Sequence, residues 1–253
     1  MRIFLKTEDE IILLRAASQL ATRALIEVGR HVVPRLALSH LRNKVVNAVM
    51  RTVPTESNSG KEALSSDTEF TFFVNGAYIE PSLEGECMLC EGDWLTVNCW
   101  VCLDGYYSFG AHTFIVGSSQ DDEPMTSTLR DMLRQVVRRA SAGHSIKEMS
   151  RTVYSLHSHD PYVLQKTFGH GVGRNRVENP ILRMNPGVND AVLLKEGMCL
   201  VIALAFKHGR SHLIKPRLMH ESTFHNPFVP FGTTVVVRPG RPEILTSFET
   251  IVK

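Results

Sequence analysis

A histidine between two glycines, in the segment Gly169-His170-Gly171, is the first candidate for chemistry in this sequence. An imidazole can bind a divalent metal ion, or act as a general acid or base near neutral pH. A single imidazole holds a divalent ion weakly, however. We therefore favour a structural role, in which His170 is hydrogen-bonded within a glycine-rich pair of strands, and keep a residual catalytic role as the alternative.

Four of the five cysteines form two pairs with the spacing typical of zinc or redox sites, Cys87 with Cys90 and Cys99 with Cys102. Cys99 and Cys102 fall on a predicted strand, where residues three apart point to opposite faces. We therefore expect these thiols to pack as small buried hydrophobic groups. An odd number of cysteines in a chain of this length also argues against a disulfide framework.

Histidines also gather in one later segment, which contains His208, His212, His220, Glu221 and His225. A transition-metal site is one interpretation. We favour a solvated polar loop, because no clear helical spacing aligns these side chains. The basic stretch from Arg134 to Arg139 is interpreted as an exposed helix face and not as a nucleic-acid site.

The composition is that of an ordinary globular protein, with 253 residues, 43% hydrophobic and 21% charged. We expect one domain over residues 1–253. A formal charge of +2 is too small to predict a nucleic-acid or membrane partner. The sequence has neither a signal-peptide pattern at its start nor a long uncharged apolar run, so we expect a cytoplasmic protein.

The elements that must position these residues follow from capping and periodicity. Thr7 and Glu10 form a capping-box pattern that predicts a helix up to Pro34, and a second helix is expected from near Ser39. Strands over residues 94–103 and 106–116 follow, then helices over 127–142 and after Ser145, then strands over 199–206 and 233–237. Grouped helices and strands favour an α+β fold with two similar halves.

The glycine-rich segment continues as Gly169-His170-Gly171-Val172-Gly173-Arg174, followed by Glu178-Asn179-Pro180. It resembles the GHGIGR…E-x-P signature of the methionine aminopeptidases. Other segments match that family in the same order along the chain, among them Leu5-Lys6-Thr7, Val74-Asn75, Glu91-Gly92-Asp93, Asp104-Gly105-Tyr106 and Leu194-Lys195-Glu196-Gly197-Met198. The resemblance implies the pita-bread fold of the creatinase and aminopeptidase family. This fold has two pseudo-two-fold halves and a curved antiparallel sheet covered by helices.

An active member of that family binds two divalent metal ions through two Asp, one His and two Glu. The positions that match these ligands are Asn98, Phe109, His170, Ala203 and Gly232. Carboxylates offset the repulsion between two closely spaced cations, and here only the histidine is retained. These departures from the family pattern therefore lead us to expect no di-metal site and no metal cofactor. Two further substrate-contacting histidines of the family are replaced by Glu80 and Val177.

Strand alternation places Asn98 and Trp100 on one face, so we expect Trp100 beside Phe109, with space opposite them at Ala203 and Gly232. The aromatic rings would occupy volume that ions and carboxylates fill in the active family members. We therefore predict an apolar ligand pocket formed by seven residues: Glu80, Asn98, Trp100, Phe109, His170, Ala203 and Gly232.

The function expected from this pattern is that of a pseudoenzyme, which binds a peptide, a protein or a small molecule without metal-dependent hydrolysis. Metal-free pita-bread domains that bind proteins or RNA give precedent in the wider family. One alternative is a metal-independent enzyme that uses His170, Glu80 and a nearby thiol or hydroxyl, as the non-metal creatinase relatives suggest. Another is a genuine aminopeptidase that removes N-terminal methionine.

Overall fold

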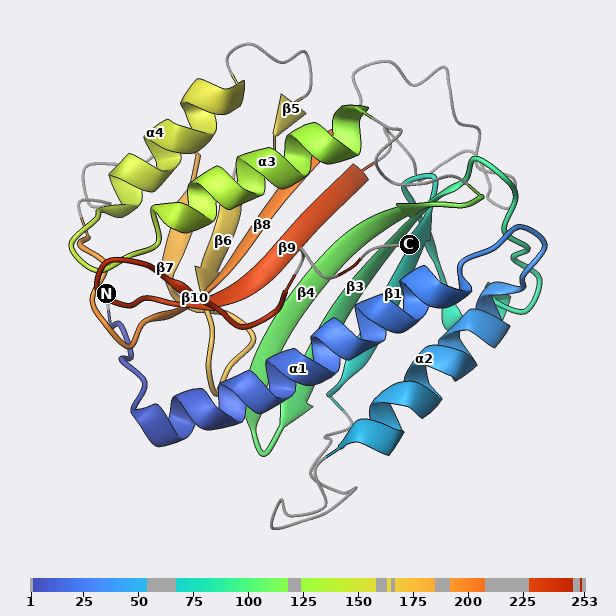
Figure 1. The fold of residues 1–253 in the computed structure, drawn as a ribbon, viewed down its shortest axis with the longest axis horizontal. Helices are drawn as coiled ribbons and strands as arrows, with labels where there is room; N and C mark the ends of the chain where they lie inside the picture. Colours follow the sequence, from blue (N-terminus) through green and yellow to red (C-terminus); the bar gives the residue numbers. More distant parts are fainter. Residues whose placement is uncertain are drawn as a thin grey trace.

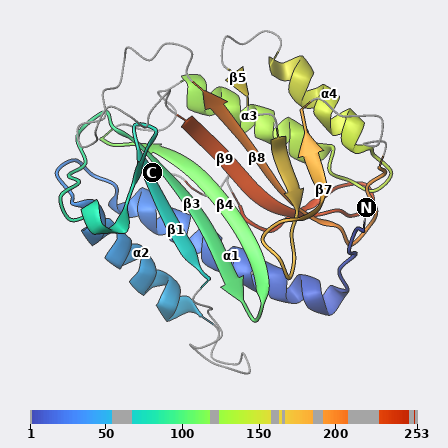
Figure 2. The same ribbon diagram turned by 180° about the vertical axis from the view of Figure 1, so that it is seen from behind.

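The computed structural model describes residues 2–53, 67–117, 124–157, 163–164, 167–184, 192–207, 228–247 and 251. Within these ranges, four α-helices lie over one face of a ten-stranded sheet (Figure 1). The opposite face, seen in Figure 2, has no helix over it among the described residues. This arrangement confirms the predicted α+β class.

The first half of the chain contains α1 (Glu8–His31), α2 (Leu38–Thr52), β1 (Glu69–Val74), β2 (Ala77–Ile79), a 3-10 turn (η2, Pro81–Leu83), β3 (Trp94–Leu103) and β4 (Tyr106–Ile115). The second half contains α3 (Pro124–Arg138), α4 (Ile146–His157), β5 (Val163–Leu164), β6 (Thr167–Gly171), β7 (Glu178–Arg183), β8 (Cys199–Lys207), β9 (Phe228–Val236) and β10 (Glu243–Ile244). Each half therefore places a pair of helices before its strands, as predicted.

Reciprocal capping boxes define the starts of α1 and α4. The Thr7 hydroxyl accepts a hydrogen bond from the Glu10 backbone N–H at 3.3 Å, and the Glu10 carboxylate accepts one from the Thr7 N–H at 3.0 Å. Ser145 and Glu148 make the same pair of bonds at 3.2 and 2.6 Å. Each box satisfies two N–H groups that the helix cannot pair internally, which confirms both predicted helix starts.

The strands run in the order β2-β1-β3-β4-β9-β8-β6-β7, with β10 paired to β9 and β5 to β8. The hairpin between β3 and β4 turns at Asp104 and Gly105, whose φ angles are 49° and 77°. Two positive φ angles are what a tight hairpin turn requires. The two halves of the sheet join where β4 meets β9, through one register pair, Ala111 opposite Gly232.

Three apolar clusters form the core. One packs α1 and α2 against β1, β3 and β4, and a second packs α3 and α4 against the strands of the other half. The third lies where the halves meet and contains Phe109, Ala111 and Val201. Alternate residues of β3, such as Val97 and Cys99, belong to the first cluster, so Asn98 and Trp100 face the open side of the sheet.

The differences from the sequence-based expectation are at element ends and in short strands. α3 covers Pro124–Arg138 and not residues 127–142, and α1 ends at His31. The short strands β2 and β10 had too few residues to show a period in the sequence. The histidines between 208 and 225 lie outside the described residues. No helix among the described residues is long and apolar enough to span a membrane.

Candidate functional site

A row of four small or polar residues crosses the open face at the junction of the two halves. Asn98 on β3 pairs with Ala111 on β4, Ala111 pairs with Gly232 on β9, and Gly232 pairs with Ala203 on β8. Trp100 lies two residues after Asn98 and pairs with Phe109. The sheet register therefore brings together five of the seven predicted pocket residues, and His170 on β6 pairs with Val201 on the neighbouring strand.

The ring of Phe109 fills the space beside Gly232. A Cβ atom on Gly232 would lie 2.6 Å from Cε1 of Phe109 and 3.1 Å from Cβ of Ala203. No side chain larger than hydrogen fits there without moving the ring. Phe109 is 7% exposed, so its ring is almost fully removed from solvent.

Trp100 lies between three other side chains. Its ring centroid is 4.7 Å from that of Phe109, at an interplanar angle of 44°, and 6.1 Å from the imidazole of His170, which is stacked at 9°. The guanidinium of Arg176 lies 5.7 Å from the Trp100 ring and 5.7 Å from the Tyr107 ring. Such distances allow aromatic and cation–π attraction. Arg176 also donates a hydrogen bond to Glu69 at 2.8 Å, which fixes it over the aromatic rings.

The glycines on either side of His170 are required by the close approach of neighbouring strands. A Cβ on Gly169 would lie 2.1 Å from the carbonyl oxygen of Val201, and one on Gly171 would lie 2.4 Å from that of Asn179. Strand β6 could not fit between β8 and β7 with larger residues at these positions. The glycine pattern is thus explained by the fold alone, whatever His170 does.

The surroundings of His170 favour the neutral imidazole. Its Nδ1 lies 2.8 Å from the carbonyl oxygen of Gly171. Because a carbonyl oxygen only accepts, Nδ1 carries the proton and donates the hydrogen bond. Burial lowers the pKa of His170 below its usual value, and the bond to Gly171 opposes this effect in part. In this tautomer Nε2 keeps its lone pair and can accept a proton or a hydrogen bond.

Asn98 contributes a buried acceptor. Its Oδ1 atom is inaccessible to solvent and has no hydrogen-bond partner among the described residues. An unsatisfied buried acceptor costs on the order of 1–3 kcal/mol. Because solvent does not reach this oxygen, a ligand could bond to it only if the neighbouring side chains moved aside.

Glu80 lies apart from this group. Glu80 is exposed just after β2, and β1 separates β2 from β3. Val177 is also exposed. The structure therefore gives no contact between Glu80 and the aromatic group within the described residues.

The cysteines are all free thiols. Cys99 belongs to the core under α1 and α2, and burial raises its pKa. Burial also raises the pKa of Cys199, to about 12. Among the described residues, no three His, Cys, Asp or Glu side chains lie close enough together to hold a metal ion.

The pattern in the sequence did not reveal a buried ion pair near the site. Lys6 and Glu178 are joined at 2.5 Å, and their side chains are only 5% and 4% exposed. Glu178 also accepts a hydrogen bond from the Asn175 N–H at 3.2 Å. Lys6 crosses over Gly173, where a Cβ would lie 2.3 Å from its Cε. Lys6 and Glu178 both lie in segments that carry the family resemblance. That shared location was the only hint in the sequence that the two residues have a role.

Comparisons with known proteins identify the family. The profile of the family described as "Metallopeptidase family M24" matches residues 12–238. A methionine aminopeptidase of Helicobacter pylori is 28% identical over 225 residues, which cover 85% of this chain and 87% of that protein. One from Clostridium perfringens is 25% identical over 248 residues, covering 96% and 98%.

Solved structures show the same fold. A methionine aminopeptidase from Thermotoga maritima superposes with a TM-score of 0.78 at 20% identity, covering 97% of this chain and all of that one. The N-terminal domain of the FACT complex subunit SPT16 from chickpea gives a TM-score of 0.70 at 16% identity, covering 98% of this chain and 59% of that one. These matches confirm the predicted pita-bread fold.

A pH experiment tests the environment of His170. The folded pKa lies below the unfolded value of 6.5, so between the two values the unfolded chain binds more protons. The free energy of unfolding therefore falls as the pH is lowered through about 6.5 towards the folded pKa. Urea denaturation at a series of pH values should show a larger loss for the wild-type chain than for His170→Asn. Parallel curves for the two chains would show that His170 is not desolvated in the folded state.

A double-mutant cycle tests the contact between Phe109 and Gly232. Gly232→Ala should lower the free energy of unfolding by about 1–3 kcal/mol, because the added methyl group overlaps the ring. In a Phe109→Ala background the same substitution should cost much less, because only the closer contact with Cβ of Ala203 at 3.1 Å remains. Chemical denaturation of the four chains measures the coupling. Additivity to within ~0.5 kcal/mol would mean that the ring does not occupy this position.

Proposed function

The chain belongs to metallopeptidase family M24, and we propose that it is a non-catalytic relative of the methionine aminopeptidases. In this proposal it binds a peptide, a protein or another ligand without metal-dependent hydrolysis. The packing of Phe109 against Gly232 and Ala203 is the observation that carries the proposal. Three of the five positions that match the metal ligands of the family therefore take part in one apolar contact.

The donor set at these positions does not fit a pair of divalent ions. Asn98 offers an amide oxygen and His170 an imidazole nitrogen, while Phe109, Ala203 and Gly232 offer no side-chain donor. Two adjacent cations need anionic ligands to offset their repulsion, and these five positions supply none.

The energetics favour the ring in this place. Burial of an aromatic side chain contributes roughly 1.5–3 kcal/mol, and the tilted contact between the Trp100 and Phe109 rings adds to it. Glutamates at 203 and 232 would instead place charge against this ring, at a cost in desolvation. Acidic residues at positions 203 and 232 would therefore require the Phe109 ring to move out of its present place.

The remaining open-face groups suit a peptide. Trp100 presents a partly exposed ring for an apolar side chain. Arg176 places a cation beside that ring, within reach of a carboxylate. These two groups offer complementary contacts that need no bond cleavage.

A metal-independent enzyme is the second candidate, and the state of His170 favours it. A neutral imidazole whose Nδ1 donates to a carbonyl leaves Nε2 as a general base. Glu80 is exposed and apart from His170 in the sheet, so it adds nothing to this candidate in the described structure.

Metal content and peptidase activity test the proposal together. The full chain is incubated with Co²⁺ or Mn²⁺, desalted, and assayed by elemental analysis and by cleavage of a methionyl tripeptide. We expect far less than one ion per chain and no turnover above that of a buffer blank, because the donor set lacks carboxylates. An active methionine aminopeptidase treated in parallel serves as the positive control.

Two results would contradict the proposal in different ways. Stoichiometric metal with metal-dependent turnover would identify a genuine aminopeptidase. Turnover that survives a chelator and is lost in His170→Asn would support the metal-independent enzyme instead.

A further inference from the structure

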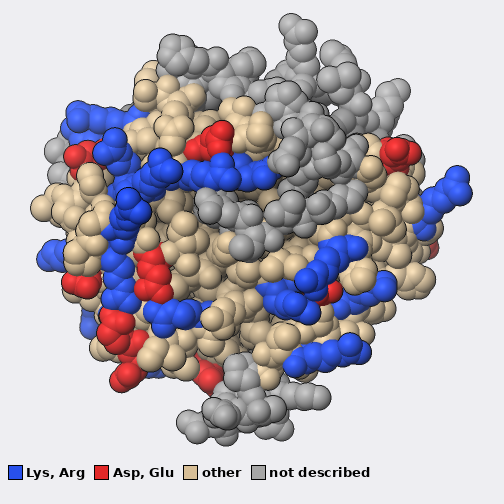
Figure 3. Space-filling view, viewed as in Figure 1, with Lys and Arg blue, Asp and Glu red and all other residues tan. Residues whose placement is uncertain are grey.

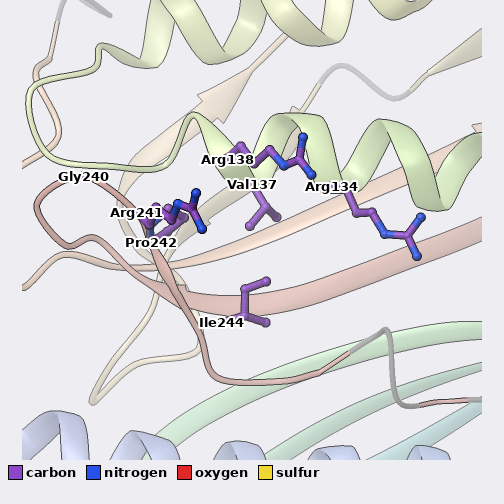
Figure 4. A pocket seen from close by; sticks show the side chains of 7 residues that line it. All are labelled: Arg134, Val137, Arg138, Gly240, Arg241, Pro242 and Ile244. Atoms are coloured by element: carbon purple, nitrogen blue, oxygen red, sulfur yellow. The ribbon is translucent and has the colours of Figure 1, made fainter.

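A hollow of about 530 Å³ lies on the helix-covered side of the molecule, between α3 and the turn that leads into β10. Figure 4 shows Arg134, Val137 and Arg138 on α3 and, across the hollow, Arg241, Pro242 and Ile244. The hollow is on the opposite side of the sheet from Trp100 and His170. It is therefore separate from the open-face site.

Three guanidinium groups surround this hollow. Arg134 forms an ion pair with Asp131 at 2.5 Å. Among the residues that the structure describes, neither Arg138 nor Arg241 has an acidic partner. The carboxylate of nearby Glu243 is already engaged by Arg15 at 2.6 Å and by Arg238 at 3.1 Å.

The positive charge extends beyond the hollow. Arg138 also borders a second hollow of about 320 Å³, lined by Gln135, Arg139 and Thr152. In Figure 3 a band of basic side chains crosses the surface over α3, with acidic side chains at its edge. Converging cations around a concave surface produce a positive potential that attracts an anionic partner.

The lining is not only charged. Ile244 is 41% exposed, and it lies with Val137 and Pro242 between the arginines. A partner that places an apolar side chain over Ile244 would remove this surface from water. The hollow thus combines a small apolar area with a basic rim, the pattern of a specific contact surface.

We propose that this hollow docks an acidic peptide segment of a partner protein, with carboxylates on Arg138 and Arg241 and an apolar side chain over Ile244. The apolar lining favours a peptide over nucleic acid, whose backbone offers phosphates but no aliphatic group. A formal charge of +2 over the whole chain also supplies little of the general attraction that nucleic acid requires. The inference does not depend on whether the open-face site is catalytic.

The test measures binding of a fluorescein-labelled peptide, in which a leucine is flanked on each side by two glutamates, to the full chain by fluorescence anisotropy. The Arg138→Glu/Arg241→Glu variant should bind roughly tenfold more weakly, since two attractive charges become repulsive. Lys44→Glu/Arg51→Glu is the matched control, because these exposed residues line a separate hollow between α1 and α2. It makes the same change in net charge and should alter affinity less than about twofold.

Further arms distinguish the possible outcomes. Ile244→Ser should weaken binding of the leucine peptide but not of the same peptide with glycine in place of leucine. Arg138→Gln/Arg241→Gln checks the charge effect in a milder form, and thermal melting verifies that every variant is folded. Equal weakening in the two glutamate double variants, or no binding of the acidic peptide to the wild-type chain, would overturn the proposal. So would tighter binding of a single-stranded RNA dodecamer that is lost in Arg138→Glu/Arg241→Glu.

Discussion

The contact between the Phe109 ring and the bare backbone of Gly232 is the interaction on which the rest of the structure depends. It lies beside the single register pair that joins the two halves of the sheet, Ala111 opposite Gly232. The backbone of Phe109 is fixed there as well, because the hydroxyls of Thr234 and Thr246 bond to it at 2.9 Å. The same residue thus joins the sheet and fills the space beside Gly232, so the packing of this site and the integrity of the fold are coupled.

Several residues of the family signature have a packing role in this chain. The glycines around His170 are needed for β6 to pack between β8 and β7, and Glu178 forms a buried ion pair with Lys6. Removing one partner of such a pair would leave an uncompensated buried charge, which is a structural reason to retain both. A glycine-rich motif can therefore persist for reasons of packing. The side chains that face the open side of the sheet decide the chemistry.

Much of this arrangement could be predicted from local patterns, and the rest depended on contacts distant in sequence. Capping boxes and strand alternation identify α1, α4, β3 and the side on which Trp100 lies, because these signals are local. The pairing of Lys6 with Glu178, and the position of Arg176 over Trp100, join segments far apart in the chain. The distance of Glu80 from the aromatic group depended on the strand order, which no single segment encodes. The basic hollow likewise required α3 and the turn before β10 to be brought together.

The most direct test of the central claim is a crystal structure of the full chain grown with excess Mn²⁺, with anomalous diffraction measured at the manganese edge. The account predicts the Phe109 ring against Gly232 and no anomalous peak between Asn98 and His170. A manganese ion at that position, with Phe109 rotated away from Gly232, would contradict it.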